Sequence, residues 1–216
     1  MAETETHNKI IESFLTLLSE ETWDDVTLSR IADHAGISLS EFRRHFDGKI
    51  ALVSAFSRQI DEAVLDEIDK EVSEELPRER LMDILLSRFD QLAPHKAALR
   101  TMIRAADRDL SLAAQFNRIL LVSMTWMLNA ANINTGGMEG AVRVQGTAMV
   151  FGRVMKMFVD DDESMARTMA KLDRELRKGE RNMRRFDQLS SFLAPLRRFK
   201  TRRRARSVED VVDEQV

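Results

Sequence analysis

The sequence predicts an all-α fold of nine helices, with an N-terminal three-helix unit that contains a helix-turn-helix and a larger helical domain after it. Only three Pro and eight Gly occur in 216 residues, a balance that favours helix along nearly the whole chain. Apolar residues recur at three- and four-residue spacing, and no segment makes a convincing strand. Hydrophobic residues make up 44% and charged residues 32%, which is ordinary for a globular protein with a sizeable core.

The first two helices are marked by an apolar face and by capping residues. Thr27 suits the N-cap of a short helix that runs through Ala35, and Gly36 suits its end in the left-handed conformation. The helix before it has one apolar face, formed by Ile10, Ile11, Phe14, Leu17 and Leu18.

The third helix follows directly after the glycine turn. Ser38 is its expected N-cap, and Glu41 comes three residues later, which is the spacing of a capping box. Phe42 and Phe46 share the face that turns to the core. Residues 27–46 are therefore predicted to form a helix-turn-helix, a motif whose second helix enters the major groove of DNA.

Six further helices are predicted. Pro77 and Pro94 each suit the first turn of a helix, and the segment NINTGGMEG interrupts the apolar pattern. The expected ranges are 49–74, 77–92, 94–106, 110–132, 139–158 and 162–189. The predicted domains are 1–48 for DNA binding, 49–189 for ligand binding and dimerisation, and 190–216 for a disordered tail, first basic and then acidic.

The last predicted helix carries apolar residues in alternating four- and three-residue steps, broken only at Gly179. Two interpretations fit this spacing equally well. The helix packs against the core of its own chain, or it forms the seam between two copies in a homodimer. The residues are Met165, Met169, Leu172, Leu176, Met183 and Phe186.

What the sequence lacks disfavours several classes of protein. There is no Cys, which excludes disulfides and Cys nucleophiles, and no Ser/His/Asp set or phosphate loop points to an enzyme or a cofactor. The acidic run 160–163 lacks metal-loop spacing and is expected to begin a helix. The start MAETETHNK is no signal peptide, and the apolar run 119–131 is shorter than the roughly 20 residues of a membrane span. We therefore expect a cytoplasmic protein without metal.

Charge is distributed unevenly. The whole chain has a net charge of −3, but residues 1–66 hold six Lys or Arg against thirteen Asp or Glu, a net of −7. An acidic N-terminal unit argues against DNA binding, for which a basic surface is usual. Residues 197–206 carry seven positive charges and no negative one. This basic run has three interpretations: a solvated tail, a nonspecific contact with nucleic acid, or a surface for anionic lipid.

The run TLSRIADHAGISLSEFRRHFDGKIAL, residues 27–52, resembles the N-terminal domain of TetR-family transcriptional regulators. The resemblance covers residues 6–66, and the helix count extends it over most of the chain. It implies a homodimer in which the three N-terminal helices read double-stranded operator DNA and a long fourth helix connects them to the rest. It also implies a dimer bundle made of the last two helices and a ligand cavity among the middle helices.

Carried over onto this sequence, the resemblance places DNA contacts in and around the motif. Thr27 corresponds to a helix cap that can touch phosphate, and Lys49 to a basic residue that meets the DNA backbone. The sequence departs from the family where Ser40 replaces a common Gly, Glu41 a small hydroxyl residue and Arg43 a Tyr. Arg pairs well with phosphate or guanine, whereas Glu does not. The expected contacts are Thr27, Ser38, Leu39, Ser40, Arg43, Arg44, His45 and Lys49.

A second, closer resemblance is to the ubiquinone-biosynthesis lipid-binding proteins that share the TetR fold. It rests on LMDILLSRFDQLAPHKAALRTMIR (81–104) and FVDDDESMARTMAKLDRELRKGE (158–180). It implies a dimer that binds a lipid or isoprenoid as an accessory protein of quinone metabolism, without DNA binding. Those proteins also carry an amphipathic membrane-binding helix, but its counterpart SSFLAPLRRFK (190–200) is interrupted by Pro195, which argues against contact with a membrane surface. The regulator is our first hypothesis and the lipid carrier the alternative.

An apolar ligand pocket is predicted among the middle helices, where soft apolar side chains concentrate. Met adapts to irregular cavities, and ligand pockets are mostly apolar. The same residues also suit ordinary core packing. They are Met102, Phe116, Leu120, Met124, Met127, Met149, Phe151 and Met155.

Overall fold

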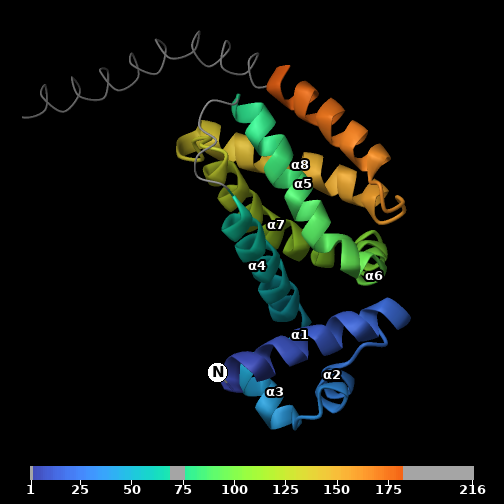
Figure 1. Cartoon of the computed structure of the whole chain (residues 1–216). Helices are drawn as coiled ribbons and strands as arrows, with labels where there is room; N and C mark the ends of the chain where they lie inside the picture. The colour runs from blue at the N-terminus through green and yellow to red at the C-terminus, as the bar shows by residue number, and fades with distance from the viewer. Residues whose placement is uncertain (1, 69–75, 182–216) are drawn as a thin grey trace, which may run out of the picture. The chain divides into compact units, whose positions relative to one another are not determined.

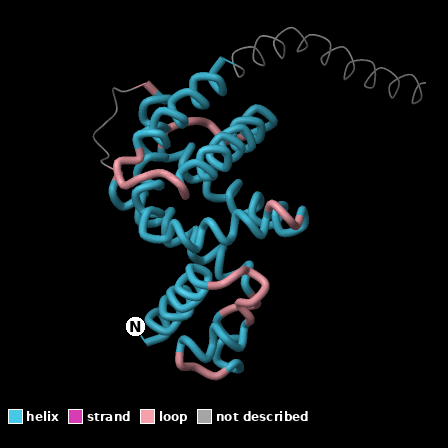
Figure 2. Tube along the Cα trace, turned by 90° about the vertical axis from the view of Figure 1, so that its right-hand side faces the viewer, coloured by secondary structure: helices cyan, strands magenta, loops and turns pink. Residues whose placement is uncertain are grey.

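The computed structural model of the chain describes residues 2–68 and 76–181. Residues 1–176 form one compact unit, and residues 177–216 form a second, of which 177–181 are described. Within the described ranges every long element is an α-helix and no strand occurs, as the tube view in Figure 2 shows. The predicted all-α fold is confirmed.

Eight α-helices lie wholly within the described residues, and a further helical segment, 166–181, reaches the end of that part of the chain. A short 3-10 helix, η1, precedes α6. The elements are α1 (Ala2–Glu20), α2 (Leu28–Ala35), α3 (Leu39–His45), α4 (Lys49–Glu67), α5 (Pro77–Leu92), η1 (Ala93–His95), α6 (Lys96–Ala106), α7 (Leu110–Ala130) and α8 (Gly137–Phe158).

Five boundaries differ from the predicted ones. Helix α7 ends at Ala130 and not at 132, and α8 begins at Gly137 and not at 139. Helix α4 ends at Glu67, and residues 69–74 of its predicted continuation lie outside the described residues. Pro94 lies in η1 and not in the first turn of α6, which begins at Lys96. The last helix begins at residue 166 and not at 162, because Met165 has a left-handed φ of 49° that a right-handed helix cannot contain.

The three N-terminal helices pack together, and α4 leads from them into the larger group of helices (Figure 1). Helix α1 contacts α2, α4 and α6, so its apolar residues serve both the helix-turn-helix and the rest of the fold. Each residue of its predicted apolar face is buried, as are Ile31, Ala32 and Ala35 of α2. The apolar periodicity of the sequence therefore identified this part of the core correctly.

The remaining helices build a second part of the core around α7, which contacts α4, α5, α6 and α8. Phe89 of α5 stacks on Phe151 of α8 with ring centroids 4.5 Å apart, and it meets Phe158 at 4.8 Å. All three rings are buried. Among the described helices, none has both the length and the apolar character needed to cross a bilayer.

Most apolar residues of the predicted seam that the structure describes are buried within the chain. Met165, Leu172 and Leu176 are buried, and only Met169 is exposed, at 39%. The burial of these three side chains within one chain fits the first of the two interpretations of the four- and three-residue spacing, and the dimer seam stays a prediction. Met183 and Phe186 lie outside the described residues.

Candidate DNA-binding surface and ligand cavity

The turn of the helix-turn-helix has the geometry that the sequence predicted. Gly36 has φ 66° and ψ 35°, the left-handed conformation that favours glycine, and it follows the last residue of α2. The Ile37 N–H donates to the Ala32 carbonyl at 3.0 Å, and the Gly36 N–H donates to the Asp33 carbonyl at 3.0 Å. This pair of bonds ends α2 sharply and sets the direction of α3.

Both helices of the motif have side-chain caps. The Thr27 hydroxyl accepts from the Arg30 N–H at 3.4 Å, and the Ser38 hydroxyl accepts from the Glu41 N–H at 3.2 Å. Phe42 and Phe46 are buried, and they fix the inner face of α3. Because the inner face is fixed, the residues on the opposite face of α3 are exposed to solvent.

That exposed face carries the polar and basic residues expected to meet DNA. Ser38, Leu39, Ser40, Arg43 and Arg44 are all exposed, and Leu39 is an apolar residue with half of its surface open (51%). Ser38 and Ser40 share a hydrogen bond between hydroxyls at 3.0 Å. The Arg43 guanidinium forms an ion pair with Asp47, and both side chains are exposed. Such a pair is weak and can exchange for a phosphate.

Glu41 lies at the edge of this face, half-buried. Its backbone N–H is held by Ser38, but no bond from the Ser38 N–H to the Glu41 carboxylate is present among the described residues. Only half of the predicted capping box is therefore formed. The carboxylate still lies in the first turn of α3, where the helix dipole favours a negative charge.

Lys49 makes contacts that the sequence did not suggest. Its ammonium donates to the Trp23 carbonyl at 2.5 Å and lies 4.5 Å from the centroid of the Trp23 ring. Burial lowers the pKa of Lys49, and the nearby Asp24 partly opposes this change. In this arrangement the ammonium is directed to the α1–α2 loop, so a phosphate contact at Lys49 requires the side chain to turn away from Trp23.

His45, at the end of α3, packs toward α1. Its ring lies 6.2 Å from that of His7, and His7 in turn lies 4.4 Å from the ring of Phe46. His45 is half-buried, so it contributes less to the exposed face than the two arginines before it.

An apolar cavity of about 380 Å³ lies among α4, α6, α7 and α8. Six of the eight residues predicted for a ligand pocket line it: Met102, Phe116, Leu120, Met149, Phe151 and Met155. The other two, Met124 and Met127, are fully buried and do not line it. They belong to the buried core of α7.

The cavity wall also contains polar residues that the sequence did not identify: Ser57, Arg88, Asp107, Asn117 and Lys156. Arg88 is buried and pairs with Asp61, Nη1 to Oδ1, at 2.5 Å. The Ser123 hydroxyl donates to the same carboxylate oxygen at 2.7 Å, and the guanidinium lies 5.4 Å from the Phe151 ring. Burial raises the pKa of Asp61, whereas Arg88 and Ser123 oppose this by stabilising its charged form.

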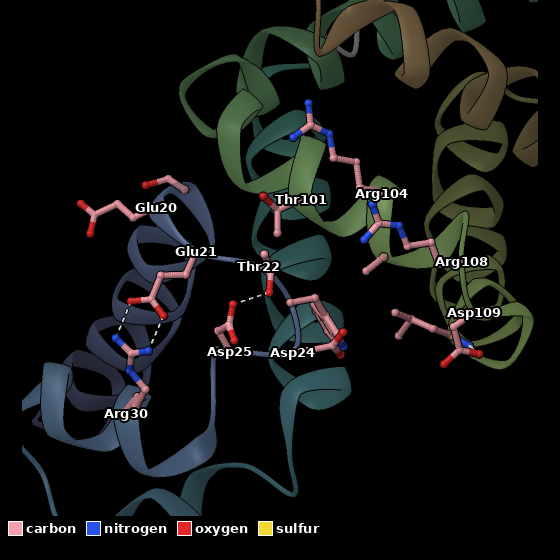
Figure 3. A pocket seen from close by; sticks show the side chains of 14 residues that line it. Glu20, Glu21, Thr22, Asp24, Asp25, Arg30, Thr101, Arg104, Arg108 and Asp109 are labelled. Atoms are coloured by element: carbon pink, nitrogen blue, oxygen red, sulfur yellow. Dashed lines mark hydrogen bonds and ion pairs between the residues drawn. The ribbon is translucent and has the colours of Figure 1, made fainter.

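A second and larger hollow, of about 890 Å³, is polar (Figure 3). It separates the end of α1 and the α1–α2 loop from α6 and the turn after it. Acidic residues of the loop, including Asp24 and Asp25, line one side, and Arg104 and Arg108 line the other. Its charged lining does not suit an apolar ligand. Trp23 lines this hollow. Its ring also packs against the ring of Phe116, which lines the apolar cavity, with ring centroids 5.5 Å apart.

No group of three or more His, Asp or Glu placed to hold a metal ion occurs within residues 2–68 and 76–181. In the acidic run, Asp161 accepts from the Thr168 N–H at 2.8 Å and from its hydroxyl at 2.7 Å. This carboxylate therefore caps the start of the last helix. The basic run 197–206 and the segment 190–200 lie outside the described residues.

No protein-family model matches the chain. The HTH-type transcriptional regulator BetI 1 of Chromohalobacter salexigens is 28% identical over 97 residues, which are 44% of this chain. The match spans about half of that relative's length, 48%.

Solved structures of TetR regulators resemble the chain over most of its length. The regulator from Nitrosomonas europaea has a TM-score of 0.64 and 20% identity, covering 81% of this chain and 97% of its own. A regulator from Rhodococcus sp. RHA1 has a TM-score of 0.58 and 19% identity, and the match covers 83% of this chain and 97% of that regulator. The fatty acid degradation regulator FadR from Bacillus halodurans has a TM-score of 0.52 and 16% identity, and the match covers 80% of this chain and 93% of FadR. The chain therefore has the fold of TetR-family transcriptional regulators.

Proposed function

We propose that the chain is a cytoplasmic, homodimeric transcriptional regulator that binds operator DNA through α2 and α3 and responds to an apolar ligand. The observation that carries this proposal is the exposed face of α3. Arg43 and Arg44 stand side by side on a helix whose opposite face is anchored by two buried phenylalanines. This is the arrangement by which a helix-turn-helix presents side chains to the major groove.

A chain of aromatic contacts supports coupling between the ligand cavity and the DNA-binding surface. Phe116 lines the cavity and touches Trp23, and Trp23 holds Lys49 at the start of α4. Helix α4 begins four residues after α3 ends. A ligand that displaces Phe116 acts, by this route, on the position of α4 and on the spacing between the two recognition helices of the dimer.

The test is binding of the full-length protein to DNA from its own promoter region over a salt series. We expect sequence-specific binding that weakens steeply as salt rises, because arginine–phosphate contacts release counterions. Replacing Arg43 and Arg44 together with Ala should reduce specific binding by roughly 100-fold or more, at about 1–3 kcal/mol for each lost contact. As a matched control, Arg143→Ala on α8 removes a positive charge paired with Glu139 outside the motif and should leave binding unchanged.

A second candidate function is a lipid-binding accessory protein that keeps the fold without binding DNA. Three observations favour it: the net charge of −7 over residues 1–66, the pairing of Arg43 with Asp47, and the direction of Lys49 toward Trp23. If the native protein shows no specific DNA binding even at low salt, the regulator proposal fails. Analysis of lipids that copurify with the protein would then test this second function.

A further inference from the structure

The wall of the apolar cavity is electrically neutral, although three residues that line it carry charge. Arg88 is paired with Asp61, and Lys156 is paired with Asp107, Nζ to Oδ1, at 2.5 Å. Each positive charge thus has one negative partner. A ligand that enters finds no unpaired charge on this wall.

The two ion pairs differ in how deeply they are buried. The side chains of Arg88 and Asp61 are 4% and 9% exposed, whereas those of Lys156 and Asp107 are 57% and 54% exposed. Water screens the outer pair, and the inner pair lies in surroundings of lower dielectric constant. A charge brought to the inner end of the cavity therefore interacts mainly with Arg88 and Asp61.

Arg88 has hydrogen-bond donors beyond those it uses. A guanidinium has five N–H groups. Nη1 donates to Asp61 and Nη2 donates to Ser57 at 3.1 Å, while the buried Nε has no acceptor among the described residues. A buried donor without an acceptor is costly. Since Arg88 lines the cavity and its Nη atoms donate only to Asp61 and Ser57 among the described residues, a bound molecule can offer an acceptor to a further guanidinium N–H.

Three classes of apolar ligand behave differently here. A carboxylate adds a negative charge beside Asp61 that no group in the inner wall neutralises, which is unfavourable away from water. A plain hydrocarbon fills the cavity but offers no acceptor to Arg88. An uncharged molecule with a carbonyl oxygen offers the acceptor and leaves the charges balanced.

We propose, building on the ligand-responsive regulator above, that the cavity binds an uncharged apolar molecule that carries a carbonyl oxygen, and that the Arg88 guanidinium donates to this oxygen. Ketones, esters and quinones share this chemistry. Met102, Leu120 and Met155 surround the apolar part. The volume of about 380 Å³ lies near the lower end of the range for small-molecule pockets.

The test uses three probes of equal chain length, octan-2-one, octanoate and octane. Each displaces an uncharged fluorescent dye, Nile red, from the full-length protein at pH 7.5. We expect octan-2-one to bind roughly 10- to 100-fold more tightly than either other probe, the range for a hydrogen bond to a charged group. Octanoate binding as tightly as octan-2-one, or more tightly, would overturn the proposal. This comparison needs no variant.

Two substitutions make the test sharper. Asp61→Asn leaves Arg88 with an unbalanced positive charge, so octanoate should become the tightest of the three probes. Asp107→Asn makes the same change of charge at the screened outer pair and should leave the order unchanged. Thermal melts establish that both variants are folded. An unchanged order in folded Asp61→Asn protein would contradict the role of the inner pair.

The probe assay contains no DNA, so the two proposals fail separately. If octan-2-one binds as expected but operator DNA is never bound, the inference about the cavity stands and the regulator proposal fails. If operator DNA is bound specifically but the order of the probes is absent, only the inference about the cavity fails.

Discussion

His7 of α1 lies beside the end of α3, where its ring packs on Phe46 and lies near the ring of His45. Burial lowers the pKa of His7 below its ordinary value of 6.5, and the charges of His45 and Arg58 lower it further. The folded chain therefore binds this proton less readily than the unfolded chain does. Its contribution to stability is complete above pH 6.5 and is lost as the pH falls below that value.

We predict that His7→Gln reduces the loss of unfolding free energy between pH 7.5 and pH 5.5, because Gln does not titrate. The measurement is urea unfolding of the native chain and the variant at both pH values, comparing the two differences. Burial also lowers the pKa of His95, against an opposing effect of Glu12, so part of the loss should remain. Equal losses in the native chain and the variant would show that His7 does not contribute.

At the scale of elements, the caps were predictable from the sequence because they act locally. Thr27, Gly36 and Ser38 satisfy backbone groups within a few residues of themselves, so their identity and spacing determine where α2 and α3 begin and end. The exposed face of α3 followed from the same periodicity, since the buried Phe42 and Phe46 fix the side opposite the arginines.

Contacts between distant segments were not predictable in this way. Arg88 and Asp61 are 27 positions apart, and their pairing depends on how α4 packs against α5. The sequence does contain a signal, because Arg88 falls on the apolar face of its helix among Ile84, Leu85 and Phe89. A charge at such a position indicates a buried partner. The spacing of the last helix had no comparable signal, because a core-facing helix and a dimer seam repeat alike.

Trp23 is the residue through which the α1–α2 loop meets both the cavity and α4. Its ring contacts Phe14 and Phe116 edge-on, at 6.0 Å and 5.5 Å, and carries the Lys49 ammonium. The other tryptophan, Trp126, is exposed on α7. The two tryptophans therefore report on different surroundings.

We predict that the Trp126→Phe variant, in which Trp23 is the only tryptophan, changes its fluorescence emission both when the cavity is filled and when operator DNA binds. Displacement of Phe116 alters the ring environment in the first case, and movement of Lys49 alters it in the second. Trp23→Phe is the matched control, because its remaining exposed tryptophan should respond to octan-2-one hardly at all. If the emission of Trp23 changes neither with octan-2-one nor with operator DNA, the cavity and α4 are not connected through this residue.

At the scale of the whole molecule, the exposed apolar residues of α8 are our candidates for the contact of the proposed homodimer. Met138, Val142 and Met149 share one side of that helix, and each is at least 38% exposed in the single chain. Met169 adds an exposed apolar side chain on the last helix. These residues replace the buried members of the predicted seam in our proposal for the homodimer.

We predict that Val142→Arg converts the protein to a species with the mass of one chain, because two copies of the new charge would face each other across a twofold contact. Light scattering after size-exclusion chromatography measures this mass. Operator affinity should fall on the order of 100-fold, since the two half-sites would no longer be bound together. Leu110→Arg, at a residue 89% exposed elsewhere, is the control and should remain a dimer. A dimeric Val142→Arg protein would place the contact on another surface.

The balanced charges around Arg88 also bear on how a signal reaches the protein. Uncharged apolar molecules diffuse through a lipid bilayer unaided, whereas a carboxylate pays the high cost of moving a charge out of water. A regulator whose cavity selects the uncharged class senses such a compound without a dedicated uptake system. An uncharged compound reaches similar concentrations on both sides of the membrane. Through the pair formed by Arg88 and Asp61, gene expression would then respond to the concentration of that compound outside the cell.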